Sequence, residues 1–144
     1  MSAAKSNDDV CLCMTLRRAS RAATRLYDEW MKESGLKITQ FSLLRNIGRA
    51  GTIHVTELAR RLELERTAMG RNLDLLTRKG LIRNVGDDPD LRKRTVALTA
   101  EGERVQLAAE PVWRRAQAEM RRRLSKGAFA SLHAVVAELQ SAKA

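Results

Sequence analysis

Only two residues, Glu63 and Leu64, separate two helical patterns in the middle of this 144-residue chain. The first pattern covers residues 55–62, where apolar side chains recur on one side. The second covers residues 65–79 and stops at Gly80, the residue type that commonly follows a helix C-terminus. Two helices joined this closely are typical of a helix-turn-helix unit.

Two short β-prone segments follow the second helix. Residues 81–85 and 95–98 flank the turn formers at 86–90, so the pattern predicts a β-hairpin. Its tip ends in a basic run at 92–94. Helix, turn, helix and hairpin in this order predict a winged helix-turn-helix. In that fold the second helix enters the major groove of DNA, while the hairpin reaches phosphates or the minor groove.

The helical patterns at the two ends of the chain carry long apolar stripes. These stripes are longer than the small middle region can cover, and such faces are usually buried in a partner. We therefore expect a mainly α homodimer. Its expected parts are a disordered N-terminus at 1–9, dimerisation helices at 10–36 and 99–144, and a winged helix-turn-helix lobe at 37–98.

Three threonines and one proline bear on where helices begin and break. Thr39, Thr56 and Thr99 are predicted N-caps, because each stands at the start of an apolar-periodic segment. Pro111 falls inside the apolar stripe of the long helix that follows Thr99. Because proline removes a helical hydrogen bond and clashes with the preceding turn, we expect a kink or a break near Glu110.

Composition narrows the class of partner. The chain has 27 basic and 17 acidic residues, a net charge of +10 and a pI near 10.6. Such a charge points to a polyanion, either nucleic acid or an anionic membrane surface. The sequence contains no apolar run long enough to span a membrane and no secretory leader pattern, so we expect a cytoplasmic protein without a membrane partner.

Signatures of catalysis are missing from the sequence. Neither His54 nor His133 has a Cys, Asp or Glu at metal-ligand spacing, and His54 is interpreted as structural. No phosphate-binding glycine loop and no nucleophile elbow occurs. We therefore expect a protein that is not an enzyme and that has neither a cofactor nor a metal site.

Residues 55–82, followed by 88–99, resemble the multiple-antibiotic-resistance regulator (MarR) family of bacterial transcription factors. The most specific part is an Asp-x-Arg motif at 90–92 followed by a strand ending in Leu-Thr at 98–99, and the similarity extends over about residues 10–140. The resemblance implies a dimeric winged helix-turn-helix regulator whose terminal helices form the interface. It also implies a palindromic double-stranded operator, repression as the usual mode and a place at the nucleoid in the cytoplasm.

The resemblance places five residues at the front of the recognition helix: Glu65, Arg66, Thr67, Gly70 and Arg71. Helix geometry supports most of them, because at about 100° per residue the apolar positions gather on the side opposite Arg66 and Arg71. These arginines can bind phosphate or guanine O6 and N7, and Gly70 lets DNA approach closely. The alternative for both arginines is a solvated helix face.

The hairpin tip supplies the other predicted DNA contacts. The resemblance makes Arg92 the wing arginine, with Lys93 and Arg94 beside it. We interpret Asp90 as orienting an arginine through a carboxylate–guanidinium pair, because phosphate repels a carboxylate. The alternative for the basic run is a solubilising tip.

Asn72 departs from the family pattern, which has an apolar residue at this position of the recognition helix. On the helical wheel it falls between Ala68 and Leu76, at the edge of the core-facing side. We therefore expect the Asn72 side chain to have a hydrogen-bond partner and exclude it from the DNA contacts.

The resemblance further implies a response to small anionic aromatic molecules, which bind between the dimerisation helices and the DNA-binding lobe. Cys13 and Arg17 lie one turn apart on the first helix, with Tyr27 and Trp30 further along the same face. An arginine beside apolar side chains suits an aromatic carboxylate. The alternative is that Arg17 pairs with an acid while Tyr27 and Trp30 pack at the interface.

Some members of the resembled family respond to oxidants instead, and Cys11 and Cys13 are the redox candidates. Residues two apart on a helix point to different sides, so a bridge between these thiols requires unwinding. Pairing across subunits is a second route, and a small buried apolar role is the alternative. A further alternative for the whole chain is a sequence-independent architectural DNA-binding protein, or a sensor that acts through a protein partner.

Overall fold

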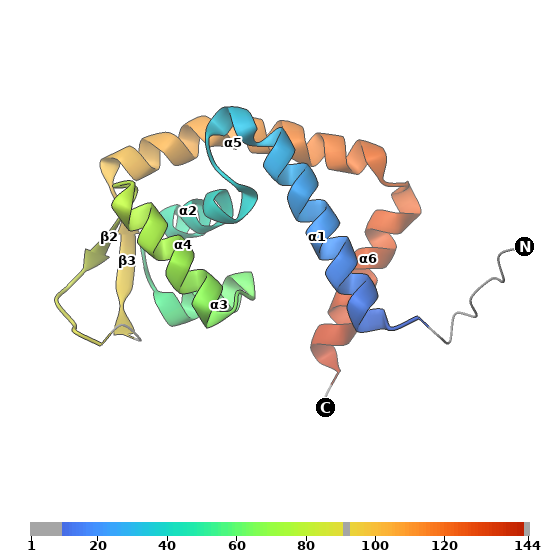
Figure 1. Cartoon of the computed structure of the whole chain (residues 1–144), viewed down its shortest axis with the longest axis horizontal. Helices are drawn as coiled ribbons and strands as arrows, with labels where there is room; N and C mark the ends of the chain where they lie inside the picture. Colours follow the sequence, from blue (N-terminus) through green and yellow to red (C-terminus); the bar gives the residue numbers. More distant parts are fainter. Residues whose placement is uncertain (1–9, 91–92, 143–144) are drawn as a thin grey trace, which may run out of the picture.

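The computed structural model describes residues 10–90 and 93–142, and it has the expected mainly helical winged helix-turn-helix fold (Figure 1). The predicted N-terminal segment 1–9 lies outside the described residues. In the described part the elements are α1 (Leu12–Trp30), the 3-10 turn η2 (Lys32–Ser34), α2 (Ile38–Ala50), β1 (Thr52–His54), α3 (Val55–Leu62), α4 (Arg66–Arg78), β2 (Ile82–Val85), β3 (Thr95–Leu98), α5 (Ala100–Arg123) and α6 (Lys126–Ser141).

The predicted hairpin is part of a three-stranded antiparallel sheet in the order β1-β3-β2. Ile53 of β1 stands opposite Val96 of β3, and Ile82 of β2 stands opposite Leu98. All four side chains are buried. The short strand after α2 therefore completes the sheet that carries the wing.

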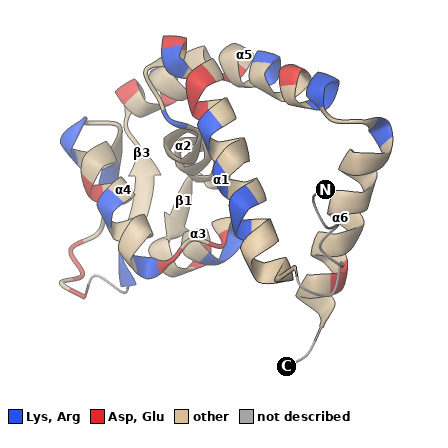
Figure 2. Cartoon of the chain, turned by 45° about the vertical axis from the view of Figure 1, so that its right-hand side comes forward, with Lys and Arg blue, Asp and Glu red and all other residues tan. Residues whose placement is uncertain are grey.

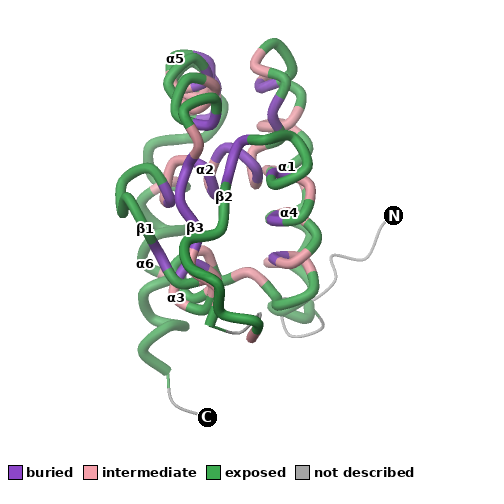
Figure 3. The backbone as a smooth tube through the Cα atoms, turned by 90° about the vertical axis from the view of Figure 1, so that its left-hand side faces the viewer, coloured by how far each residue is buried: buried purple, intermediate pink, exposed green. Residues whose placement is uncertain are grey.

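One core joins the sheet to α2, α3 and α4, which we call the lobe (Figure 3). Its largest fully buried side chains lie on α2, α3, α4 and β3 and on the segment after α1: Met31, Phe41, Leu43, Leu44, Ile47, Leu58, Met69, Leu73, Leu76 and Val96. The core reaches α5 through Ala109, Val112 and Ala116. Leu and Met dominate this core, so burial of aliphatic area supplies most of its stabilisation.

Helix α2 begins at Ile38, so the prediction that Thr39 is its N-cap is wrong. The free N–H groups at this end have partners from elsewhere. The carboxylate of Asp28, on α1, accepts from the Ile38 N–H at 2.9 Å, and the Gln40 side chain accepts from the Lys37 N–H at 3.1 Å. Thr39 has no capping role because these two acceptors already satisfy the helix start.

Helix α3 begins at Val55, so Thr56 is not its N-cap either. His54 occupies the cap position in an extended conformation without a capping side-chain bond. The Val55 N–H instead donates to the carbonyl of Arg94 at 2.9 Å, which takes over part of the cap's function. Thr99 is the one threonine of the three that caps as predicted, since its hydroxyl accepts from the Gly102 N–H at 3.0 Å.

Helix α5 runs without a break from Ala100 to Arg123, so of the kink or break that the sequence predicts near Glu110 the break does not occur. The hydrogen bond that Pro111 removes is the one to the carbonyl of Leu107, four residues earlier. Leu107 is 67% exposed, so water has access to this part of the helix. Ala109, Val112 and Ala116 pack on the opposite side and hold the helix on the core.

Helices α1 and α6, which we call the stem, have no buried residues within one chain. On α6 the predicted stripe stays open, with Leu132 46%, Val136 40% and Leu139 46% exposed. On α1 Leu12 is 55% and Met14 43% exposed. The two helices lie beside the lobe under the far end of α5 (Figure 1). Tyr27 and Trp30 at the end of α1 pack against the core, whereas the apolar residues named above stay exposed in the described chain.

Candidate nucleic-acid interface

Helix α4 presents a polar face to solvent and an apolar face to the core. Met69, Leu73 and Leu76 are buried, while Arg66, Thr67, Arg71, Asp74 and Arg78 are exposed. The helical-wheel prediction of which side faces inward is confirmed. The structure therefore leaves Arg66, Thr67 and Arg71 accessible on one surface of the lobe, as a DNA contact requires.

Asn72 lies at the edge of this face. Its amide donates to the carbonyl of Ala68, four residues earlier, at 2.8 Å, and the residue is half-buried. The expectation of a hydrogen-bonded polar group flanking the core is confirmed. The side chain is engaged with its own helix, so it adds no donor to the exposed face.

The turn between α3 and α4 sets where the helix begins. Glu63 takes a left-handed conformation with φ of 49°, and Glu65 is the N-cap residue in an extended conformation. Both residues are exposed. The Glu63 carboxylate also accepts from the side chain of Gln140 at 2.8 Å, so the end of α6 contacts this turn.

A groove of about 550 Å³ runs between α3 and α4. Its floor includes Met69 and Leu73, and Arg66, Asp74 and Arg94 also line it. Gly70 lies along it, and a Cβ added there would meet no atom within 4 Å. The open space at Gly70 is compatible with the predicted close approach of DNA.

The wing residues are only partly described, because Arg92 lies outside the described residues. Lys93 is exposed, and its N–H donates to the Asp90 carbonyl at 2.9 Å. The Asp90 N–H in turn donates to the Asp88 carboxylate at 2.9 Å. These bonds order the backbone on both sides of the tip, and the predicted role of the Asp90 carboxylate stays a prediction.

Arg94 has surroundings that differ from those of Lys93. Only 15% of its side chain is exposed. The guanidinium donates to the side chains of Asn84 on β2 and Thr77 on α4, and it lies 3.7 Å from the carboxylate of Asp74. The side chain therefore turns inward from the wing to α4.

Charge is unevenly distributed over the chain (Figure 2). Basic residues occur along α1 and α4 and near the end of α5. On α3, Arg60 and Arg61 both bond the Glu57 carboxylate, and their hydrogen bonds lower the pKa of Glu57 to about 2. Arg66 and Arg71 have no ion pair within the described chain, so their charges are available to a partner.

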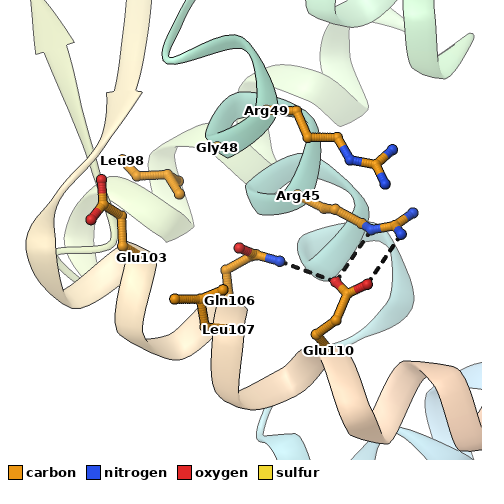
Figure 4. Close-up of a pocket in the computed structure, with 8 residues that line it drawn as sticks. All are labelled: Arg45, Gly48, Arg49, Leu98, Glu103, Gln106, Leu107 and Glu110. Atoms are coloured by element: carbon orange, nitrogen blue, oxygen red, sulfur yellow. Dashed lines mark hydrogen bonds and ion pairs between the residues drawn. The ribbon is translucent and has the colours of Figure 1, made fainter.

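A polar cluster fastens α2 to α5 (Figure 4). The Arg45 guanidinium binds both carboxylate oxygens of Glu110, at 3.1 and 3.3 Å, and Gln106 donates to the same carboxylate at 3.2 Å. Arg45 also lies 4.2 Å from the ring centroid of Trp113, which stacks on Phe41. Two lobe residues are thus tied to α5 by charge and by aromatic contact.

The candidate effector residues separate into two groups along α1. Cys13 and Arg17 line a shallow groove of about 470 Å³ with Leu12, Leu16, Ser20 and Leu139. Tyr27 and Trp30 lie further along, in edge-to-face contact at 5.9 Å between ring centroids. The structure therefore does not bring the four residues into one pocket within a single chain.

Tyr27 and Trp30 are engaged with α5. The Tyr27 hydroxyl donates to the Gln117 side chain, and burial raises the pKa of Tyr27 while the charge of Arg121 opposes this rise. The Arg123 guanidinium lies 5.1 Å from the Trp30 ring centroid. These contacts give both aromatic side chains a packing role in the described chain.

Cys11 and Cys13 are both free and exposed in the described chain. Cys11 is the N-cap residue of α1, and Cys13 lies in the first turn. A role as small buried residues is therefore not seen within one chain. His54, interpreted as structural, has its ring Nδ1 3.0 Å from the Thr95 hydroxyl, across the β1–β3 pair.

The described residues contain neither a membrane-spanning helix nor a candidate metal site. None of the helices there is long and apolar enough to cross a membrane. Over residues 10–90 and 93–142 there is also no group of three or more His, Cys, Asp or Glu side chains arranged to hold a metal ion.

Comparison with known proteins identifies the family to which this fold and this exposed helix face belong. The MarR family model matches residues 34–93. The crystal structure of the transcriptional regulator MosR of Mycobacterium tuberculosis in complex with DNA is 38% identical, with 90% of this chain and 93% of that chain covered and a TM-score of 0.75. The chain belongs to the MarR family. It is accordingly a transcriptional regulator and not an enzyme, as the sequence predicted.

Other MarR-family structures agree in fold. A second MosR structure is 34% identical over 92% of this chain and 94% of that chain, with a TM-score of 0.76. A cysteine-to-serine mutant of Escherichia coli MarR complexed with operator DNA is 23% identical over 92% and 96%, with a TM-score of 0.76. No curated protein matches the chain.

The sequence reasoning missed the polar contacts around Arg94. Thr77 and Asp74 lie on α4 and Asn84 on β2, and nothing in the local pattern pairs them with an arginine that starts the next strand. The available signal was the alternation of side chains across the hairpin, which points successive residues to opposite faces. In this MarR-family wing, Lys93 and Arg94 are neighbours with opposite surroundings.

Proposed function

We propose that this MarR-family regulator is a homodimeric, sequence-specific DNA-binding repressor that holds a palindromic operator. The observation that carries the proposal is the exposed face of α4 next to the β2–β3 hairpin, where Thr67 is exposed and Arg66 and Arg71 have no ion pair in the described part of the chain. The 38% identical MosR structure and the E. coli MarR mutant structure are both complexes with DNA. A protein with this function acts at the nucleoid in the cytoplasm.

The proposed contacts divide by what they reach on DNA. The front of α4, from Glu65 to Arg71, enters the major groove, where Arg66 and Arg71 bind guanine edges or phosphates. Gly70 allows close approach. The wing, with Lys93 and the sequence-assigned Arg92, binds backbone phosphate or the minor groove, and Asp90 orients an arginine rather than DNA.

The proposed dimer follows from the uncovered stem. Residues 10–36 and 99–144 supply the dimerisation helices, and residues 37–98 supply the DNA-binding lobe. Support comes from Leu132, Val136 and Leu139 on α6, which form an apolar stripe that one chain leaves open. Two-fold symmetry places the two copies of α4 on successive major grooves, about one helical turn apart.

Selection of the purified protein on a pool of random duplex DNA tests this function. At about 150 mM salt non-specific phosphate binding is largely suppressed. Enrichment of an inverted repeat with half-sites about 10 base pairs apart supports a specific dimeric regulator. Binding without enrichment, which fades uniformly as salt rises, supports the architectural alternative and contradicts sequence-specific repression.

A small anionic aromatic molecule is the proposed effector that releases DNA. The groove around Arg17 supports this, because its other lining side chains, Leu12, Leu16 and Leu139, are apolar and suit an aromatic ring while the guanidinium pairs a carboxylate. Binding there acts on the contact between α1 and α6. That contact is part of the proposed dimer interface, so a ligand can change the separation of the two lobes.

Thiol oxidation is the second candidate input, and the exposure of both cysteines favours it. A peroxide oxidises one thiolate to a sulfenic acid, and the second thiol condenses with it to a disulfide and water. Bridging Cys11 and Cys13 requires the first turn of α1 to unwind. No buried residue anchors that turn in the described chain, so little packing opposes its unwinding.

Two variants separate these inputs. Arg17→Ala is expected to abolish release of DNA by salicylate-like aromatic carboxylates while leaving the response to peroxide. Cys13→Ser is expected to do the reverse. Retention of both responses in both variants contradicts both proposed sites, and DNA binding without an inducer serves as the control for folding.

A further inference from the structure

Arg94, at the end of the wing, contacts several elements of the lobe through its backbone and its side chain. It immediately precedes β3, and its backbone carbonyl accepts from the Val55 N–H at the start of α3. Its side chain bonds Asn84 on β2 and reaches Thr77 on α4, with a distance of 3.2 Å from Nη2 to the Thr77 Oγ1. One residue thus touches α3, α4, β2 and β3.

We propose that Arg94 is a positioning residue for DNA recognition, which fixes the wing against α4 and offsets the charge of Asp74. This inference rests on the proposed function and assigns Arg94 an indirect role in place of a direct DNA contact. The low exposure of its side chain, 15%, carries the distinction. Two hydrogen bonds, to Asn84 and Thr77, and the ion pair with Asp74 hold the guanidinium against protein groups, turned away from the solvent where phosphate would lie.

The geometry suits an arginine specifically. Its planar fork directs Nε to Asn84, Nη2 to Thr77 and Nη1 to Asp74. The Thr77 hydroxyl donates to the Leu73 carbonyl at 2.8 Å, which leaves its oxygen lone pairs to accept from Arg94. A lysine ammonium at the same place is a compact point charge and cannot span three partners in three directions.

The position of Asp74 gives the pair an electrostatic consequence. Its side chain is 69% exposed on α4, on the same surface as Arg71. An uncompensated carboxylate there repels DNA phosphate, and the adjacent guanidinium reduces this repulsion. Arg94 therefore favours DNA binding by neutralising an acid as well as by holding the wing.

The first test needs no DNA. Hydrogen exchange of the free homodimer is compared for wild type, Arg94→Met, Arg94→Lys and the control Arg83→Met, which removes an exposed charge from the same hairpin. We expect exchange in β2 and the last half of α4 to be about tenfold faster in Arg94→Met and Arg94→Lys, and unchanged in Arg83→Met. Wild-type exchange in Arg94→Met would overturn the positioning role, and thermal unfolding checks that each variant is folded.

The second test uses the duplex that the wild-type protein enriches from the random pool, with a scrambled duplex beside it. We expect Arg94→Met to lower the ratio of the affinities for the selected and the scrambled duplex about tenfold, with an unchanged salt dependence. In the double variant Arg94→Met with Asp74→Asn, we expect at least half of the lost affinity for the selected duplex to return. A direct phosphate contact instead lowers the salt slope by about 0.9 at an unchanged ratio, and Asp74→Asn then restores nothing. Either of these results overturns the proposal.

The two tests fail independently. If the wild-type protein enriches no sequence, the proposed function is wrong, and the hydrogen-exchange comparison still decides whether Arg94 holds the wing against α4. If a duplex is enriched but Arg94→Met behaves like Arg83→Met in both tests, the regulator stands and the positioning role is wrong.

Discussion

The lobe and the stem are built from similar amounts of helix but differ in where their apolar side chains go. In the lobe, α2 alone contributes five buried residues: Gln40, Phe41, Leu43, Leu44 and Ile47. In the stem, α1 and α6 together contribute none. The lobe therefore completes its core within one chain, whereas the stem has apolar side chains that only a second chain can bury.

This difference separates the part of the chain proposed to recognise DNA from the part proposed to form the dimer. The core of the lobe is buried within one chain, so the packing that positions α4 and the strands of the wing requires no partner residue. The stem leaves apolar side chains exposed in one chain, so the ligand or thiol oxidation proposed for the stem would act where the two chains are expected to meet. Asp28 on α1 connects the stem to α2 of the lobe, and the Arg45–Glu110 pair connects α2 to α5.

The largest expected effect comes from Gly102→Ala at the junction of the lobe with α5. A Cβ built there stands 1.9 Å from the Leu81 carbonyl oxygen, so backbone must move. We expect a loss of about 3 kcal/mol or more in unfolding free energy, measured by urea denaturation. Gly127→Ala, where nothing lies within 4 Å, is the control in the stem, and an equal loss there would contradict the comparison.

Next is the double substitution Leu132→Asp with Val136→Asp on α6. Charges on an apolar face that a partner covers are expected to raise the dimer dissociation constant about 100-fold, or about 3 kcal/mol. Sedimentation measures this shift. The lobe is expected to keep its helical signal and its cooperative unfolding, and loss of both would show that the stem is not separable from the lobe.

Arg92→Ala tests the wing without touching the stem. The sequence assigns Arg92 to the wing tip, so we expect weaker DNA binding by about 1–3 kcal/mol and an intact dimer. Fluorescence anisotropy with the selected duplex, together with sedimentation, measures both. Unchanged affinity would show that Arg92 at the wing tip does not contribute to DNA binding.

Glu110→Gln tests the connection between the lobe and α5. The Arg45 and Glu110 side chains are 23% and 18% exposed, so loss of this charge pair is expected to cost about 1–2 kcal/mol of stability. Glu101→Gln, which removes the exposed pair with Arg104, is the matched control and is expected to cost much less, because solvent screens an exposed pair. Equal losses would mean that the partly buried pair is no stronger than the exposed one.

The smallest expected effect is a pH dependence that both regions share. Hydrogen bonds from Arg60 and Arg61 lower the pKa of Glu57 in the lobe to about 2, and those from Arg122 and Arg123 lower the pKa of Glu119 near the stem to about 2. A carboxyl whose pKa is lower in the folded state stabilises it above the unfolded value. This contribution is lost as the pH falls toward the folded value.

The pH window is therefore about 4.5 to 2 for both carboxyls. The Tm difference between wild type and Glu57→Gln, or Glu119→Gln, is expected to be small and favourable at pH 6 and to vanish near pH 2. A difference that persists at pH 2 would show that the glutamates act through packing rather than charge.

Prediction from sequence succeeded where one segment contains its own determinants. Gly80 ends α4, Thr99 caps α5, and the polar and apolar sides of α4 lie where the helical period puts them. It failed where a distant residue supplied the decisive group. Thr39 and Thr56 lost their predicted capping roles because Asp28 and the Arg94 carbonyl satisfy those helix starts.

The candidate site divides in the same way. Arg66 and Arg71 were placed by the family resemblance with support from the helical period, and the structure leaves both exposed. Tyr27 and Trp30 were predicted to lie further along the helix face of Cys13 and Arg17 and to serve the same ligand, but Tyr27 and Trp30 pack against α5. A common helix face does not make a common pocket, because α5 covers only part of that face.

The sequence by itself determined the order of the elements, the faces of the helices and the family, because periodicity, turn residues and short motifs act over neighbouring positions. Only the tertiary structure decided that Arg94 turns toward Asp74 and Thr77 and that Arg45 binds Glu110. These contacts join residues between 17 and 65 positions apart. Such pairs depend on how helices and strands pack against one another. The residues next to a side chain in the sequence do not indicate which distant residue it will contact.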